Sequence, residues 1–213
     1  MATTAKICGL KTPEAVAAAL TGKASHIGFV LFDKSPRAID AETAARLAAP
    51  ARDRAKVAAL LVDPDDALAV QTATVLKPDF IQLHGRESPR RAAEIRALTG
   101  LATIKAVGVS DGADVMTALG YEGAADHLMF DAKPPKDVER PGGHGAAFDW
   151  ALLKDVRPAR PWFLAGGLDP WNVAEAIDIS RAPIVDVSSG VERGPGLKDP
   201  SLIAAFLDAV RRA

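Results

Sequence analysis

Short apolar runs rich in β-branched residues alternate eight times with Ala- and Leu-rich stretches of helical period along this chain. This alternation predicts βαβ units with right-handed crossovers, which place the strands in a parallel sheet. Eight equal units close into a barrel, so we expect an α/β fold, a single (β/α)8 TIM barrel that forms one domain over residues 1–213. The expected strands are Ala5–Cys8, His26–Leu31, Lys56–Val62, Phe80–His84, Thr103–Val107, His127–Asp131, Trp162–Ala165 and Ile184–Val187.

Five of the expected helices begin with the same device, an N-cap oxygen directly before a proline. Proline suits the first helical position because its missing N–H has no partner there in any helix. No Gly-x-Gly-x-x-Gly follows the first strand, which disfavours a doubly wound dinucleotide-binding fold. The five pairs are Thr12-Pro13, Asp63-Pro64, Ser88-Pro89, Asp169-Pro170 and Asp199-Pro200.

Charge and cysteine content restrict the partners of the chain. Its formal net charge of -1 indicates no cationic face for nucleic acid or an anionic membrane, so we expect a small-molecule partner. The single cysteine excludes an internal disulfide and a zinc site built from thiolates. The start, MATTAKICGLK, lacks the apolar stretch of a signal peptide, and no apolar run approaches the about 20 residues of a membrane span, so we expect a cytoplasmic protein. Neither composition nor patterning separates a monomer from a homodimer.

The carboxyl ends of the strands carry the chemistry of such a barrel, so the residues that end each strand are the candidates for a site. At six of the eight strands these ends are polar or glycine. Surface loops are polar in general, so the pattern supports a site without naming its chemistry. The ends are Cys8-Gly9, Asp33-Lys34-Ser35-Pro36-Arg37, His84-Gly85, Asp131, Gly166-Gly167 and Ser188-Ser189-Gly190.

A buried ion pair is expected inside the barrel. Side chains alternate along a strand, so if Cys8 faces the barrel mouth, Lys6, two residues earlier, faces the barrel interior. By the same rule, Asp186 faces the interior on the last strand if Ser188 faces the mouth. A buried Lys6 needs a partner, and the last strand neighbours the first in a closed barrel, so we predict a Lys6–Asp186 ion pair.

The glycines after the seventh and eighth strands predict a phosphate site. Backbone N–H groups close on a phosphate only where no Cβ intervenes, and these loops are where such barrels bind phosphate. Gly166, Gly167 and Gly190 meet this requirement, and Ser188 and Ser189 add hydroxyl donors. Gly166-Gly167 alone, or Ser189-Gly190 alone, would indicate no more than a tight turn.

Cys8 and Asp131 are the candidates for proton transfer. A lone cysteine is more often a core residue, but a thiol at the end of a barrel strand faces substrate and is a workable base near neutral pH. Asp131 follows the apolar residues of its strand, and apolar surroundings favour the protonated form of a carboxyl group. The alternative for Asp131 is a helix or loop cap.

Two further residues and one segment are predicted around the mouth. The planar guanidinium of Arg37 suits a substrate carboxylate, although a loop arginine is often merely solvated. His84, above Gln82 on its strand, is either a catalytic or binding group or a structural imidazole. Residues 132–147, AKPPKDVERPGGHGAA, form either a lid over the site or a surface loop.

Seven segments of the chain resemble, in order and from end to end, the phosphoribosylanthranilate isomerase family. Each segment alone is a weak match, but seven in one order are highly specific. They are KICGL at 6–10, SPR at 35–37, IQLHG at 81–85, FDA at 130–132, FDW at 148–150, LAGGLDPWNV at 164–173 and VDVSSGVE at 185–192, followed by PG and KD.

The resemblance implies an aldose–ketose isomerase of tryptophan biosynthesis. This enzyme performs an Amadori rearrangement of N-(5-phosphoribosyl)anthranilate to 1-(2-carboxyphenylamino)-1-deoxyribulose 5-phosphate. It implies that Asp131 is the general acid that protonates the furanose ring oxygen, and that Cys8 is the general base that takes the C2 proton. The substrate nitrogen is the electron sink, so neither a metal nor an organic cofactor is expected.

The resemblance also assigns the binding residues. It implies that Arg37 holds the anthranilate carboxylate, and it gives His84 no proton-transfer step. The remaining residues expected to bind substrate are Asp186 and the phosphate set Gly166, Gly167, Ser188, Ser189 and Gly190.

The chain departs from the family pattern at two positions. His144 stands in the Gly-Gly-x-Gly loop where threonine is expected, and Ala132 follows Asp131 where serine is common. Neither position touches the expected acid or base. They bear on lid closure and on substrate affinity.

Three other functions remain open. The histidine-pathway isomerase performs the same rearrangement on a larger substrate, but uses an aspartate where this chain has Cys8. A Schiff-base aldolase would use Lys105 as its nucleophile. A non-catalytic phosphate-binding barrel would not need an intact acid and base.

Overall fold

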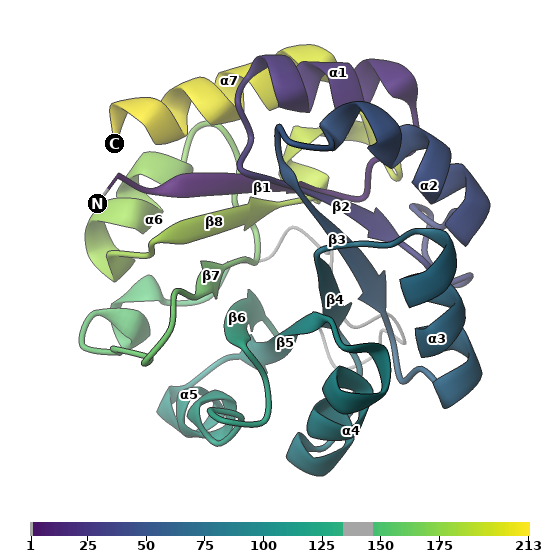
Figure 1. The fold of residues 1–213 in the computed structure, drawn as a ribbon. Helices are drawn as coiled ribbons and strands as arrows, with labels where there is room; N and C mark the ends of the chain where they lie inside the picture. The colour runs from purple at the N-terminus through teal and green to yellow at the C-terminus, as the bar shows by residue number, and fades with distance from the viewer. Residues whose placement is uncertain (1, 134–146) are drawn as a thin grey trace.

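Eight parallel strands close into a barrel in the computed structural model, which describes residues 2–133 and 147–213 (Figure 1). Each strand pairs with the next along the chain, and β8 pairs with β1, as the alternation predicted. The strands are β1 (Thr4–Cys8), β2 (His26–Val30), β3 (Lys56–Leu61), β4 (Phe80–Leu83), β5 (Ala102–Val109), β6 (His127–Ala132), β7 (Phe163–Leu164) and β8 (Ile184–Val187).

Helices cover the outside of the barrel, and the last helix lies beside the first (Figure 1). In the described part of the chain, the step from β6 to β7 carries a short 3-10 helix at Trp150–Leu153, so the eight units are not equal. The helices are α1 (Pro13–Thr21), α2 (Ala41–Ala48), α3 (Asp66–Val75), α4 (Pro89–Thr99), α5 (Gly112–Leu119), α6 (Val173–Ser180) and α7 (Pro200–Arg212).

Three of the five predicted helix starts are confirmed. Thr12, Ser88 and Asp199 each accept a backbone N–H from the first turn of α1, α4 and α7, with proline at the start of the helix. These oxygens satisfy N–H groups that have no partner within the helix.

The other two predicted starts are wrong. Helix α3 begins at Asp66 and is capped by Asp65, while Asp63 accepts the backbone N–H of Arg86 in the neighbouring loop. Helix α6 begins at Val173, and Asp169 instead accepts two N–H groups in the turn before it. In both loops the aspartate stabilises a turn, so the oxygen-proline pattern marks the loop and not the first residue of the helix.

A small hairpin after β8 was not predicted. Strands β9 (Glu192–Gly194) and β10 (Leu197–Lys198) pair antiparallel, just after a 3-10 turn at Ser189–Val191. The hairpin folds back towards the barrel mouth, since Lys198 donates to the carbonyl of Ser188 at the end of β8.

Aromatic rings close the amino-terminal end of the barrel. His26, Phe80, His127 and Phe163 form a cycle in which neighbouring ring centroids lie 5.3 to 6.1 Å apart. The interior cluster packs on this layer and shares Phe163 with it; its buried members are Ile104, Ala106, Met129, Phe163, Ala165 and Ile184. The interior is therefore packed, and the strand ends at the other face are the place for a site.

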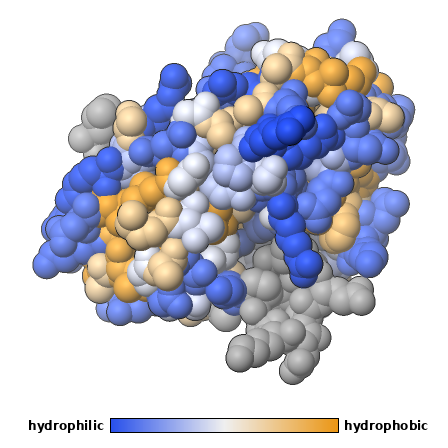
Figure 2. Space-filling model, turned by 90° about the horizontal axis from the view of Figure 1, so that it is seen from below, coloured by the Kyte–Doolittle hydropathy of each residue, from blue (hydrophilic) through white to orange (hydrophobic). Residues whose placement is uncertain are grey.

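The described ranges contain no helix that combines the length and apolar character needed to cross a membrane. The face shown in Figure 2 alternates between hydrophilic and hydrophobic patches. In the same described ranges, no three His, Cys, Asp or Glu side chains are grouped to hold a metal ion.

Candidate active site

Cys8 and Asp131 both lie at the carboxyl ends of barrel strands, as predicted. Cys8 is the last residue of β1 and is 3% exposed, with its thiol unpaired by any disulfide. Asp131 is 7% exposed and is the penultimate residue of β6, which runs one residue further than expected. Both groups are thus screened from bulk water at the end of the barrel where the loops gather.

The predicted Lys6–Asp186 ion pair is confirmed. Nζ of Lys6 lies 2.8 Å from Oδ1 of Asp186, across the β1–β8 junction that closes the barrel. Burial alone would lower the pKa of Lys6, but the negative charges of Asp186 and Cys8 raise it above its ordinary value. Lys6 is therefore a fixed cation just below the thiol.

Burial raises the pKa of the Cys8 thiol above its ordinary value, and the nearby charges act in both directions. Lys6 and Lys198 lower this pKa, and Asp186 raises it. The hydroxyl of Ser188 donates to the backbone carbonyl of Cys8 at 3.3 Å, which fixes the end of β1 against β8.

A hydrogen-bonded chain from β4 fixes Asp131. Nε2 of His84 lies 3.0 Å from Oδ2 of Asp131, and the backbone N–H of Ala132 donates to Oδ1 at 2.8 Å. Behind the imidazole, Nε2 of Gln82 lies 3.0 Å from Nδ1 of His84 and 3.3 Å from the sulfur of Met129. The apolar setting expected for Asp131 is therefore incomplete, because polar partners contact both of its oxygens.

Arg37 is buried at the mouth, and its guanidinium is already held by a carboxylate. Nε and Nη2 of Arg37 donate to the two oxygens of Glu192 at 2.7 and 2.8 Å. Gly9, with φ of 75°, makes room for this arrangement, because a Cβ there would lie 2.6 Å from Cδ of Arg37. Among the described residues, no hydrogen bond uses Nη1 of this guanidinium.

Lys198 also binds Glu192, so one carboxylate joins two cations. Nζ of Lys198 lies 2.6 Å from Oε1 of Glu192 and 2.9 Å from the carbonyl oxygen of Ser188. Burial lowers the pKa of Lys198 to about 8 despite Glu192. Burial alone would raise the pKa of Glu192, but hydrogen bonds from Arg37 and Lys198 lower it below its ordinary value. The sequence analysis assigned no role to Glu192 or Lys198. The available signal was that both charged residues lie in or just after the motif that contains the last strand.

The glycines predicted to bind phosphate sit where backbones approach each other closely. Gly166 and Gly167 adopt φ of 88° and 64°, in the left-handed region that favours glycine. A Cβ on Gly166 would lie 2.3 Å from the backbone nitrogen of Ala132, and one on Gly190 would lie 1.9 Å from the carbonyl oxygen of Leu168. The end of β6 is therefore in close backbone contact with the loop after β7, and that loop with the loop after β8.

Lys105 does not face the barrel interior. Its neighbours Ile104 and Ala106 belong to the interior cluster, and Lys105 points to the outer side of β5. There its Nζ lies 2.6 Å from Oε2 of Glu87 and 5.5 Å from the ring centre of Tyr121. A Schiff base at Lys105 with a ligand in the mouth is excluded by this orientation.

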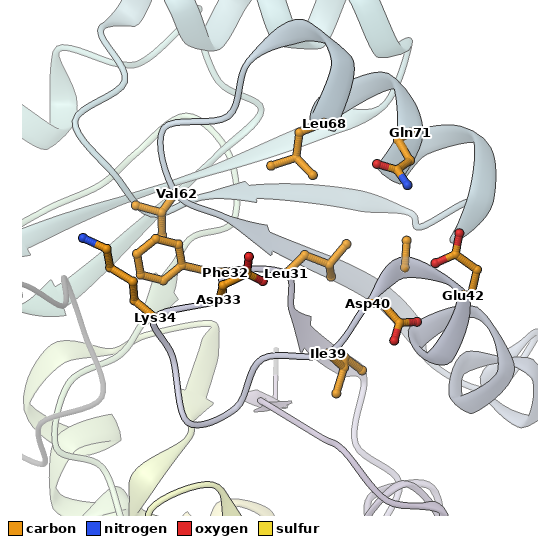
Figure 3. Close-up of a pocket in the computed structure, with 11 residues that line it drawn as sticks. Leu31, Phe32, Asp33, Lys34, Ile39, Asp40, Glu42, Val62, Leu68 and Gln71 are labelled. Carbon is orange, nitrogen blue, oxygen red and sulfur yellow. The ribbon is translucent and has the colours of Figure 1, made fainter.

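A cavity of about 420 Å³ lies beside the predicted site and not in it. Figure 3 shows Leu68 of α3 pointing towards Leu31, with the Asp40 and Glu42 carboxylates on the side of α2. None of the residues assigned a role in the site lines this cavity.

The predicted lid lies almost wholly outside the described residues. Residues 134–146, which include His144, are not described, so the lid stays a prediction. Ala132, the second departure from the family pattern, is described, and the expectation that it does not touch the acid is wrong. Its backbone N–H donates to Oδ1 of Asp131, and its backbone packs against Gly166.

Comparisons with known proteins agree with this arrangement. The family model for N-(5'-phosphoribosyl)anthranilate (PRA) isomerase matches residues 5–209. The N-(5'-phosphoribosyl)anthranilate isomerase of Caulobacter vibrioides is 60% identical over 210 residues, covering 98% of this chain and 96% of the relative.

Two solved structures are similar over almost the whole chain. Monomers generated from the dimeric phosphoribosylanthranilate isomerase of Thermotoga maritima give a TM-score of 0.85 at 32% identity, covering 99% of this chain and 100% of theirs. A phosphoribosyl anthranilate isomerase in complex with reduced 1-(o-carboxyphenylamino)-1-deoxyribulose 5-phosphate gives 0.86 at 32% identity, with the same coverage.

Proposed function

The chain belongs to the N-(5'-phosphoribosyl)anthranilate isomerase family, and we propose that it isomerises this substrate with Cys8 as general base and Asp131 as general acid. The reaction is an aldose-to-ketose isomerisation in tryptophan biosynthesis, and its substrate is a phosphosugar. The observation that carries the assignment is the placement of a buried thiol and a buried carboxyl group at strand ends, each beside its own polar partner.

Asp131 delivers the first proton. Protonation of the furanose ring oxygen opens the sugar to an iminium, and the substrate nitrogen then acidifies C2. The imidazole of His84 and the N–H of Ala132 hold the carboxyl group in place for this transfer. His84 is given no proton-transfer step of its own.

Cys8 then takes the proton from C2. The C–H electron pair moves towards the iminium nitrogen, and the resulting enolamine tautomerises to the ketone. The thiolate is the form that accepts this proton, and no redox change occurs.

Arg37 binds the anthranilate carboxylate through the edge that Glu192 leaves open. Glu192 uses Nε and one N–H of Nη2, so Nη1 and the second N–H of Nη2 form a fork of the right width for a carboxylate. The same two bonds keep the guanidinium from rotating before substrate arrives.

The phosphate binds at the loops after β7 and β8. Left-handed Gly166 and Gly167 expose backbone N–H groups, and Gly190 lets the two loops approach each other. Ser188 and Ser189 complete the set, although the Ser188 hydroxyl already contacts Cys8 and Lys198. Asp186 acts on substrate only through Lys6.

The proposal also covers the setting of the enzyme. We take residues 1–213 as one catalytic domain that acts in the cytoplasm on a small molecule and not on nucleic acid or a membrane. The related Thermotoga maritima enzyme occurs as dimers and as generated monomers, so either state suits this chain. Gel filtration with light scattering decides between them.

The test follows anthranilate fluorescence as wild type, Cys8→Ser and Asp131→Asn each meet fresh substrate in the presence of a chelator. We expect rapid change with wild type and a loss of about 100-fold or more in kcat for each variant, with the folded state checked by circular dichroism. Wild type that leaves the substrate untouched would refute the reaction. Active variants would refute the choice of acid and base while leaving the reaction intact.

A further inference from the structure

Lys6 is a fully buried cation beside the single cysteine of the chain. Lys6 and Cys8 lie two residues apart on β1 and both face the interior, and Lys6 is 0% exposed. On β2 the position opposite Cys8 is Gly28. A Cβ on Gly28 would lie 3.0 Å from the sulfur of Cys8 and 3.1 Å from Nζ of Lys6. The missing side chain leaves the space in which the ammonium and the sulfur come together.

Asp186 keeps the ammonium at this place. Its Oδ1 binds Nζ of Lys6 at 2.8 Å, and the register of β1 and β8 sets the two residues opposite each other. A lysine that bridged two strands only for stability would need the carboxylate but not the thiol. Here the cation lies against both.

We propose that Lys6 is a positioning residue of the isomerisation, whose ammonium stabilises the thiolate form of Cys8 while Asp186 holds that ammonium in place. The inference rests on the proposed function, in which Cys8 is the general base. In the step it serves, the C2–H bond breaks, an S–H bond forms, and the electron pair of the C–H bond moves into the substrate. Lys6 keeps its proton throughout.

Charged groups from three strands face the thiol. They are Lys6 on β1, Asp186 on β8 and Lys198 on β10. His26, below Lys6 on β2, is neutral near pH 7 because burial, and then the charge of Lys6, lowers its pKa to about 4. The two partners of the Lys6–Asp186 pair therefore act on the pKa of the thiol with opposite signs.

The test is a titration of the thiolate by its ultraviolet absorbance. The chain has one cysteine, so subtraction of the Cys8→Ser curve leaves the signal of a single group. We expect Lys6→Met to move the thiol titration to higher pH than wild type. We also expect kcat of Lys6→Met at neutral pH to fall about tenfold or more with little change in KM. Equal titrations in wild type and Lys6→Met would overturn the proposal.

Lys105→Met is the matched control for the loss of a buried lysine. Lys105 is 2% exposed and lies 2.6 Å from its carboxylate partner, but on the outer side of the barrel wall. We expect this variant to lose stability while its thiol titrates as in wild type. A shift equal to that of Lys6→Met would show that any buried lysine has the same effect, and would overturn the proposal.

A double variant covers the case in which Lys6→Met does not fold. Lys6→Met with Asp186→Asn leaves no uncompensated charge, and we expect its thiol to titrate at higher pH than that of Asp186→Asn alone. Identical titrations of these two proteins would overturn the proposal. Full activity of Cys8→Ser would instead refute the base of the proposed function, whatever the titrations show.

Discussion

Two buried lysine–carboxylate pairs lie on opposite sides of the barrel wall. Lys6–Asp186 bridges β1 and β8 inside the barrel, and Lys105–Glu87 lies outside β5 against the loop after β4. Their distances are 2.8 and 2.6 Å, and both lysines are almost fully buried. The chemistry of the two pairs is the same, so their different roles come from what each faces.

The outer pair braces a loop. Besides Lys105, Glu87 accepts the backbone N–H groups of Asp63 and Gly85, and thereby ties the loop after β3 to the loop after β4. The inner pair faces the thiol of Cys8 and the ring of His26 and leaves the loops alone. A buried ion pair thus stabilises the fold where it collects backbone donors, and sets a chemical state where it contacts a titratable group.

The largest effect is expected from Glu87→Gln. This change leaves the Lys105 ammonium buried without its counterion, and we expect it to lower the free energy of unfolding by about 3 kcal/mol or more. Urea denaturation measures the loss. The double variant Glu87→Gln with Lys105→Met, which leaves no buried charge unpaired, should recover much of it. If the pKa of Cys8 also changes in Glu87→Gln, the outer pair acts on the thiol as well, and the contrast between the two pairs is wrong.

The next effect is the acid sensitivity of the inner region. The pKa of His26 is about 4 in the folded chain against 6.5 in its ordinary state, so the unfolded chain takes up the proton first as pH falls. His26 therefore favours the folded state fully above about pH 6.5, and this contribution is lost between pH 6.5 and 4, at about 3 kcal/mol. Urea titrations at a series of pH values should show a shallower loss in His26→Phe. If stability falls with pH equally steeply in wild type and His26→Phe, the loss does not come from His26.

Glu192→Gln is expected to act mainly on substrate binding. The neutral amide holds Arg37 and Lys198 less firmly, and a charge-assisted bond of this kind contributes about 1.5–3 kcal/mol. We expect KM to rise about tenfold with a smaller change in kcat, measured by anthranilate fluorescence. Asp199→Asn, at the nearby start of α7, is the control for a change in this segment. A fall in kcat with unchanged KM would place Glu192 in the proton transfer instead.

The smallest effect is expected at an exposed ion pair. Lys56 binds Asp79 at 2.8 Å, but its side chain is 61% exposed. We expect Lys56→Ala to change the free energy of unfolding by less than about 1 kcal/mol, because solvent screens such a pair. Urea denaturation of Lys56→Ala and Glu87→Gln under the same conditions measures both losses of stability. Equal losses would mean that burial does not determine how much an ion pair stabilises this fold.

The fold was predictable because its signals repeat. Eight alternations of strand and helix, and the parity of side chains on β1 and β8, were enough to place Lys6 against Asp186. The Schiff-base alternative at Lys105 is wrong, because that side chain lies on the outer face of β5. The strand runs to Val109, and the residues that face inward are Ile104 and Ala106.

The site was predictable where a residue ends a strand, and not where it depends on a partner from a distant loop. Cys8 and Asp131 lie in the strands where they were expected, and His84 directly follows β4, which ends one residue earlier than expected. The bond of Arg37 to Glu192 joins residues 155 positions apart, through a hairpin of only a few residues that carries little periodicity. Hydrophobic periodicity reports on neighbours along the chain and does not pair residues this far apart.

The closure of the barrel also has a consequence for the time at which the chain becomes reactive. Lys6 and Asp186 are 180 residues apart, so the pair forms only after nearly the whole protein has left the ribosome. Until β8 arrives, Cys8 has neither its buried surroundings nor a fixed cation beneath it. A nascent or truncated chain therefore carries an ordinary thiol, and the reactive centre forms in the same event that completes the fold.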